Sequence, residues 1–138
     1  MEQMEKRRLI LAIDADGTMW EHMYPAIGPA MLGAFESLRR FQEKGDRLIL
    51  WTCREGMALQ EAITYCRLNG IEFEQHNNNA IEHDYAKSRK IYADLYIDDR
   101  MVGGFPGWEA VEKEVDKLRE IIAGTPSPIV PPSIEEHL

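Results

Sequence analysis

The chain has 138 residues, 44% hydrophobic and 29% charged, which is typical of one globular domain. Its net charge of −8 disfavours binding to duplex nucleic acid, because an acidic surface repels phosphate backbones. No apolar stretch reaches the roughly 18 residues of a membrane span, so no membrane association is expected. Two cysteines do not make a disulfide scaffold, and the first apolar run is too short for a signal peptide. We therefore expect reduced thiols and a cytoplasmic protein.

The first half of the chain predicts two strands, each followed by a helix. An unbroken apolar run at residues 9–13 fits a strand buried on both faces of a parallel sheet. Residues 30–44 carry apolar side chains at spacings of three and four, which predicts a helix. A second unbroken run at residues 47–51 predicts the next buried strand, and residues 57–68 predict the next helix.

The second half repeats this alternation less regularly. Apolar and acidic residues alternate near residues 71–73, which predicts a short, less buried strand. We expect a loop at residues 76–79, which includes a run of three asparagines, and a short helix at residues 80–86. A further strand is predicted at residues 93–97 and a helix at residues 108–122. Strands alternating with helices imply an α/β fold, with helices on both faces of a parallel sheet.

The sequence indicates one domain followed by a tail. Four prolines lie between residues 126 and 132, and proline cannot continue a helix. We therefore expect a domain over residues 1–123 and an extended, proline-rich segment over residues 124–138.

Polar residues collect where three of the predicted strands end: Asp14 and Asp16, then Thr52, then Asp98 and Asp99. The carboxyl ends of parallel strands share one edge of the sheet, where ligands bind, so these residues should converge. Two carboxylates about 4 Å apart repel each other by roughly 4 kcal/mol at an effective dielectric near 20. One such group would more often only cap a helix or a turn, but three together favour a site. Such a site needs a cation, and oxygen ligands suit Mg²⁺.

These residues resemble the four motifs of the haloacid dehalogenase (HAD) superfamily, in the same order: Asp14-Ala-Asp16-Gly17-Thr18, Thr52, Lys90 and Asp98-Asp99. The second aspartate, Asp16, indicates the phosphatase branch. The intervals from Asp14 to Thr52 and from Thr52 to Lys90 are 38 residues each, which core elements fill. The resemblance therefore implies a three-layer α/β/α sandwich with a Rossmann-like parallel sheet, a HAD-like core without a cap domain. The segments EHMYPAIG, LILWTCREG and KIYADLYIDDR resemble small capless bacterial and phage members, mostly of unassigned substrate.

The resemblance also implies a two-step phosphoryl transfer. Asp14 would attack phosphorus and form an aspartyl-phosphate. Asp16 would act as general acid and then as general base, which requires a raised pKa. Mg²⁺ would be held by Asp14, the backbone carbonyl of Asp16 and Asp98, with Asp99 as a further direct or water-mediated ligand.

Contacts to the substrate are implied for a set of residues at the first two strand ends: Gly17, Thr52, Cys53 and Arg54. The hydroxyl of Thr52 and nearby backbone amides would bind phosphoryl oxygens. Arg54 could instead form a salt bridge with Glu55 or another nearby acid. Cys53 is more readily explained by packing, with only its amide facing the phosphoryl group.

Two lysines compete for one implied role. Lys90 would balance charge near Asp14, because it precedes the strand that ends in Asp98, and Lys87 is its rival. The segment after the first motif corresponds to the flap of HAD proteins. Its aromatic and histidine side chains would contact the leaving group or serve only in packing: Trp20, His22 and Tyr24.

Two other functions stay open. The same core could transfer the phosphoryl group to an acceptor other than water. A receiver-like module could hold Mg²⁺ and phosphate without turnover, although its acid pair would follow the first strand rather than the last. The expected partner is a phosphorylated small molecule or macromolecule, and a homo-oligomer is possible.

Overall fold

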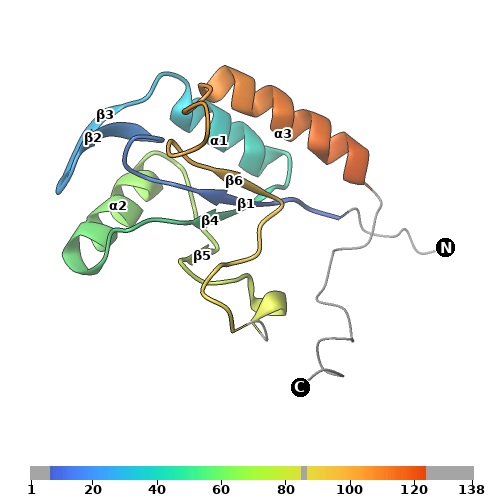
Figure 1. Cartoon of the computed structure of the whole chain (residues 1–138), viewed down its shortest axis with the longest axis horizontal. Helices are drawn as coiled ribbons and strands as arrows, with labels where there is room; N and C mark the ends of the chain where they lie inside the picture. Colours follow the sequence, from blue (N-terminus) through green and yellow to red (C-terminus); the bar gives the residue numbers. More distant parts are fainter. Residues whose placement is uncertain (1–6, 85–86, 124–138) are drawn as a thin grey trace.

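The computed structural model describes residues 7–84 and 87–123, so the proline-rich segment over 124–138 lies outside the described residues. The protein has an α/β fold built on a four-stranded parallel sheet (Figure 1). The strand order is β5-β4-β1-β6, with bounds Gln75–His76, Arg47–Leu50, Ile10–Ile13 and Leu95–Ile97. All four residues of β1 are buried, as expected for a strand in the middle of a parallel sheet. No helix in the described ranges is long and apolar enough to cross a membrane.

The three α-helices found in the described residues pack against one face of the sheet. Their bounds are Ala34–Glu43 for α1, Gly56–Leu68 for α2 and Trp108–Ile122 for α3. Leu38, Cys66 and Val115, one from each helix, belong to the same core as Leu11 and Ile13 of β1. In Figure 1, α1 and α3 lie side by side over the sheet.

The opposite face is covered differently from our expectation of helices on both sides. Ile10, Ala12 and Ile49 pack there against residues from the segment 80–93. In place of the helix expected over 80–86, this segment forms a 3₁₀ turn, η1, at Ile81–His83, and residues 85–86 are not described. The segment offers too few apolar residues at helical spacing to bury an α-helix.

A β-hairpin, absent from the predicted elements, follows β1. Its strands, β2 (Trp20–Met23) and β3 (Ala26–Ala30), pair antiparallel, and the hairpin projects from the sheet near α2 in Figure 1. In β2 only the first residue, Trp20, is buried, so this strand lacks the alternation that identifies a half-buried strand. The hairpin also moves the start of α1 from the predicted residue 30 to residue 34.

The strand predicted at residues 71–73 is wrong, because the pairing begins later. Ile71 is buried, but its N–H donates to the carbonyl of Cys66 and so closes the end of α2. The first bond to β4 runs from the N–H of Glu74 to Leu48, and the strand itself is Gln75–His76. A buried apolar residue here marks a helix end, which the local pattern does not distinguish from a strand.

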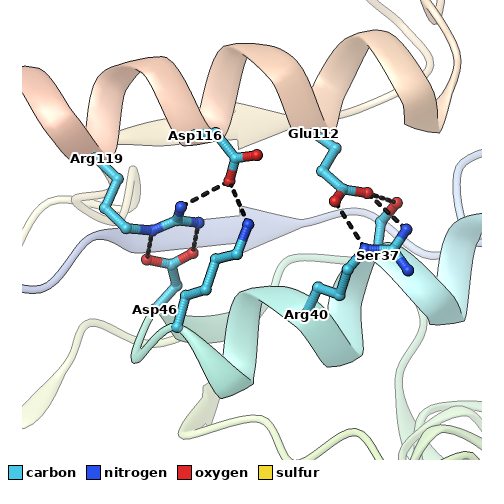
Figure 2. A network of polar contacts seen from close by, with 7 residues as sticks. Ser37, Arg40, Asp46, Glu112, Asp116 and Arg119 are labelled. Carbon is cyan, nitrogen blue, oxygen red and sulfur yellow. Dashed lines mark hydrogen bonds and ion pairs between the residues drawn. The ribbon is translucent and has the colours of Figure 1, made fainter.

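Ion pairs between α3 and the end of α1 fix these two helices against each other (Figure 2). Arg119 donates to both carboxylate oxygens of Asp46, whose side chain is only 1% exposed. Asp116 accepts hydrogen bonds from both Arg119 and Lys44. Asp46 lies three residues beyond the end of α1, so its buried charge ties the segment that closes this helix to the end of α3.

A second group of polar contacts joins the same helices nearer to their amino ends (Figure 2). Glu112 accepts hydrogen bonds from the guanidinium of Arg40 and the hydroxyl of Ser37. These contacts hold α3 in place, and its first residue, Trp108, is buried against the loop after β1. The indole N–H of Trp108 donates to the carbonyl of Thr18 at 2.8 Å.

Candidate functional site

The carboxyl ends of three strands lie level at one edge of the sheet. Ile13, the last residue of β1, is in register with Leu50 of β4 and Ile97 of β6. The N–H of Asp14 donates to the carbonyl of Ile97 at 2.9 Å, so the pairing of β1 with β6 continues to the site. The predicted convergence of polar residues at this edge is confirmed for Asp14, Thr52, Asp98 and Asp99, but not for the side chain of Asp16.

Three carboxylates form the acidic cluster: Asp14, Asp98 and Asp99. One oxygen atom from each lies within 4.8 Å of the others. Burial raises the pKa of Asp14 to about 7, and the neighbouring carboxylates add to the rise, while the hydroxyl of Thr18 opposes it. Within the described ranges, no cationic side chain hydrogen-bonds or pairs with the acidic cluster. A set of oxygen donors without a counter-charge fits a hard divalent cation such as Mg²⁺.

Two residues of the first motif shape the acidic cluster. The hydroxyl of Thr18 donates to Oδ2 of Asp14 at 2.8 Å and is fully buried. Gly17 has φ of +87°, and a Cβ atom at this position would lie 2.1 Å from Oδ2 of Asp99. Glycine is therefore required both for the backbone conformation and for the close approach of Asp99.

Asp16 does not belong to the acidic cluster. Its Oδ2 accepts from Nε of Arg54 at 2.7 Å, and its Oδ1 accepts from Nη2 of Arg54 at 2.8 Å and from the indole of Trp20 at 2.9 Å. Burial alone would raise the pKa of Asp16, but these hydrogen bonds outweigh it and the pKa lies below its usual value. The raised pKa that we expected for a general acid is therefore wrong for this conformation.

The expected contact of Arg54 with substrate is wrong, because its side chain is buried and bound to other groups of the protein. Its side chain is 1% exposed, and all five of its N–H groups are used. Besides Asp16, it donates to the carbonyls of Pro25 and Ala26 in the hairpin and Ala58 in α2. The alternative of a salt bridge was the right one, with Asp16 as the acid.

A cavity of about 380 Å³ opens beside the acidic cluster. Its lining joins residues that follow all four strands of the sheet: Asp14, Trp51, Thr52, Cys53, Asn77 and Asp98. Thr52 Oγ1 accepts the N–H of Arg54 at 3.0 Å, which leaves the hydroxyl hydrogen free to donate. A larger cavity of about 590 Å³ lies between the amino ends of α1 and α3, away from the acidic cluster, so size alone does not identify the site.

Neither candidate lysine balances the charge of Asp14. Lys90 lies over the ring of Tyr96, with Nζ 5.2 Å from the ring centroid. Lys87 donates to the carbonyl of Asp84 at 3.1 Å. Both side chains are exposed on the segment that precedes β6. A lysine therefore occurs at the place in the sequence where the HAD motif has one, but it does not contact Asp14.

The flap residues divide by burial. Trp20 is fully buried, packs edge-on against Tyr65 and donates to Asp16, so it is a packing residue rather than a contact for a leaving group. His22 and Tyr24 are exposed on the hairpin. Sequence reasoning did not identify the contact that Asn77 makes: within the expected loop, its side chain binds the backbone of Thr52.

Comparison with known proteins identifies one close structural relative. Neither the known family models nor the curated proteins match this chain. Among solved structures, a conserved protein from Bacteroides thetaiotaomicron is 44% identical, with a TM-score of 0.76 over 81% of this chain and 93% of that one. The two chains belong to one family. That relative is described as a conserved protein, so membership of its family establishes the shared fold and assigns no activity.

Proposed function

We propose that this protein is a magnesium-dependent phosphohydrolase that uses Asp14 as its nucleophile. The proposal includes a capless HAD-like core, in which the third layer comes from the described residues around Ala80 and Ile91 that pack on the second face of the sheet. One observation carries it: among the residues that the structure describes, no cationic side chain pairs with the acidic cluster, and the cluster adjoins a cavity that Thr52 also lines. A site of this composition suits an anionic substrate only when a cation is bound, and phosphate esters are substrates of that kind.

The chain's own residues supply most of the proposed chemistry. Asp14 attacks phosphorus as a carboxylate; the ester P–O bond breaks, and the leaving group departs with the bonding electron pair. Water then hydrolyses the aspartyl-phosphate, which regenerates the Asp14 carboxylate and releases inorganic phosphate. The hydrogen bond from Thr18 fixes the orientation of that carboxylate. The hydroxyl of Thr52 donates to a phosphoryl oxygen, where negative charge must be stabilised.

Asp14, Asp98 and Asp99 are the residues that would hold Mg²⁺. When bound, the ion would neutralise the acidic cluster and the phosphoryl oxygens and so allow two anions to meet. Without a cation, burial and its carboxylate neighbours raise the pKa of Asp14 to about 7. A cation at the acidic cluster favours the ionised carboxylate that the attack requires.

A second candidate function follows from the position of Asp16. Both of its carboxylate oxygens accept hydrogen bonds from Arg54 or Trp20, and Asp16 is not among the residues that line the cavity. Transfer to Asp14 from a substrate with an acidic leaving group needs no proton donor, whereas activation of water needs a base. A module that accepts a phosphoryl group and releases it slowly, or passes it to another acceptor, is therefore the alternative.

The test is phosphate release from p-nitrophenyl phosphate and a panel of phosphoesters, with Mg²⁺ and with a chelator. The proposal predicts steady turnover that requires Mg²⁺ and is abolished in Asp14→Asn. Asp84→Asn, the same chemical change at an exposed site outside the cavity, should retain the wild-type rate. A single burst without turnover would favour the slow-release module, and release that is unchanged in Asp14→Asn would exclude Asp14 as the nucleophile.

A further inference from the structure

The side chain of Asn77 completes the hydrogen-bond ladder around Thr52. Asn77 follows β5, and its backbone N–H donates to the carbonyl of Leu50 at 2.8 Å. The side-chain amide then continues the pairing. Its Oδ1 accepts the N–H of Thr52, and its Nδ2 donates to the carbonyl of Thr52, both at 2.9 Å. One side chain thus occupies both backbone polar groups of Thr52.

These contacts leave Thr52 with a single hydrogen to donate. Its backbone groups are bound to Asn77, and its Oγ1 accepts the N–H of Arg54 at 3.0 Å. The hydroxyl hydrogen is free, and Thr52 lines the same cavity as Asp14. Fixing the backbone of Thr52 on both sides therefore restricts where its hydroxyl can point.

The backbone of Asn77 argues against a role in the turn alone. Asn77 is the one residue other than glycine with a positive φ, 55°, in the ranges that the structure describes. Glycine adopts this conformation without the steric penalty of a Cβ atom. A turn would be served at least as well by glycine, whereas the two hydrogen bonds to Thr52 require the amide.

We propose that Asn77 is a positioning residue for the phosphoryl site: its side-chain amide holds the backbone of Thr52 so that the hydroxyl points into the cavity beside Asp14. The inference rests on the proposed function, in which that hydroxyl donates to a phosphoryl oxygen. Asn77 acts through Thr52.

The first test compares Asn77→Gly with Asn78→Gly, a control at the exposed neighbouring asparagine. Glycine keeps the left-handed backbone at position 77 and removes only the amide. Loss of one donor at an oxyanion site lowers kcat by about 10²-fold or more, so a misdirected donor should lower it by about tenfold. We expect this loss for Asn77→Gly on p-nitrophenyl phosphate with KM nearly unchanged, and no loss for Asn78→Gly. An unchanged kcat in Asn77→Gly would overturn the proposal.

A double-mutant cycle separates positioning from a general structural effect. If Asn77 acts through Thr52, then Asn77→Gly causes no further loss of kcat in a Thr52→Ala background. Losses that multiply in the double variant would mean that Asn77 acts independently of Thr52, and would contradict the proposal.

Amide hydrogen exchange gives a readout that does not depend on activity. The Thr52 amide should exchange slowly in the wild-type protein and in Asn78→Gly, and fast in Asn77→Gly. If the wild-type protein releases phosphate from no substrate, the proposed function fails, and this measurement still decides whether Asn77 holds Thr52. Fast exchange of the Thr52 amide in the wild-type protein would refute the hydrogen bond between this amide and the side chain of Asn77.

Discussion

Replacing Arg54 should destabilise the protein far more than replacing an exposed arginine. Arg54→Met keeps much of the apolar stem but removes five hydrogen bonds, two of which neutralise Asp16. Breaking a buried ion pair by removing one partner costs about 3–5 kcal/mol, because the other charge stays buried. The Asp16 side chain is 13% exposed, so some hydration remains, but three backbone carbonyls also lose a donor. We expect a loss of about 4 kcal/mol.

Urea unfolding followed by tryptophan fluorescence measures this loss. The matched control is Arg67→Met, which removes an ion pair whose two side chains are 60% and 68% exposed and should cost under about 1 kcal/mol. In a double variant with Asp16→Asn, much of the Arg54 penalty should disappear, because no unpaired carboxylate is left. A loss below about 1 kcal/mol for Arg54→Met would refute the view that Arg54 holds the hairpin, Asp16 and α2 together.

Three further predictions follow from burial, charge and close contact. Cys66 is fully buried, which raises the pKa of its thiol to about 12, whereas Cys53 is exposed. A thiol reagent should therefore label only Cys53 in the native protein and both cysteines after unfolding. Rapid labelling of two thiols in the native protein would contradict the burial of Cys66. Hydrogen bonds from Arg47 lower the pKa of Glu82 to about 2, so its contribution is complete above about pH 4.5 and is lost as the pH falls towards 2. Between pH 4.5 and pH 2 the urea midpoint should therefore fall less in Glu82→Gln than in the wild-type protein. An equal fall in the two proteins would contradict the lowered pKa of Glu82. Gly17→Ala places a methyl group on a carboxylate of the acidic cluster, so Mg²⁺ affinity should drop at least tenfold by calorimetry, and unchanged affinity would contradict the geometry.

The sequence predicts those parts of the fold that periodicity determines. The helix at residues 108–122 has the predicted bounds, because its buried stripe is regular and Gly107 precedes it. The strand pattern at residues 71–73 misled, because Ile71 is buried in closing α2 rather than in the sheet. The hairpin after β1 was missed because three residues of its first strand face solvent.

The acidic cluster could be predicted because topology alone brings Asp14 and Asp98 to one edge of the sheet. The pairing of Asp16 with Arg54 could not be predicted, because the position of the Arg54 side chain depends on hydrogen bonds to carbonyl groups of the hairpin. The role of Asn77 was equally hidden, because a left-handed asparagine in a turn gives no sign of what its amide binds. Side chains one or two residues beyond a strand are placed by tertiary contacts, which local patterns do not contain.

Covalent labelling tests the central claim most directly. The protein is mixed with a reactive phosphate donor, quenched in acid within milliseconds and mapped by peptide mass spectrometry. The account predicts one phosphoryl group on the peptide that contains Asp14, formed with Mg²⁺ and absent with a chelator. Turnover with no such adduct, or an adduct on a different residue, would contradict it.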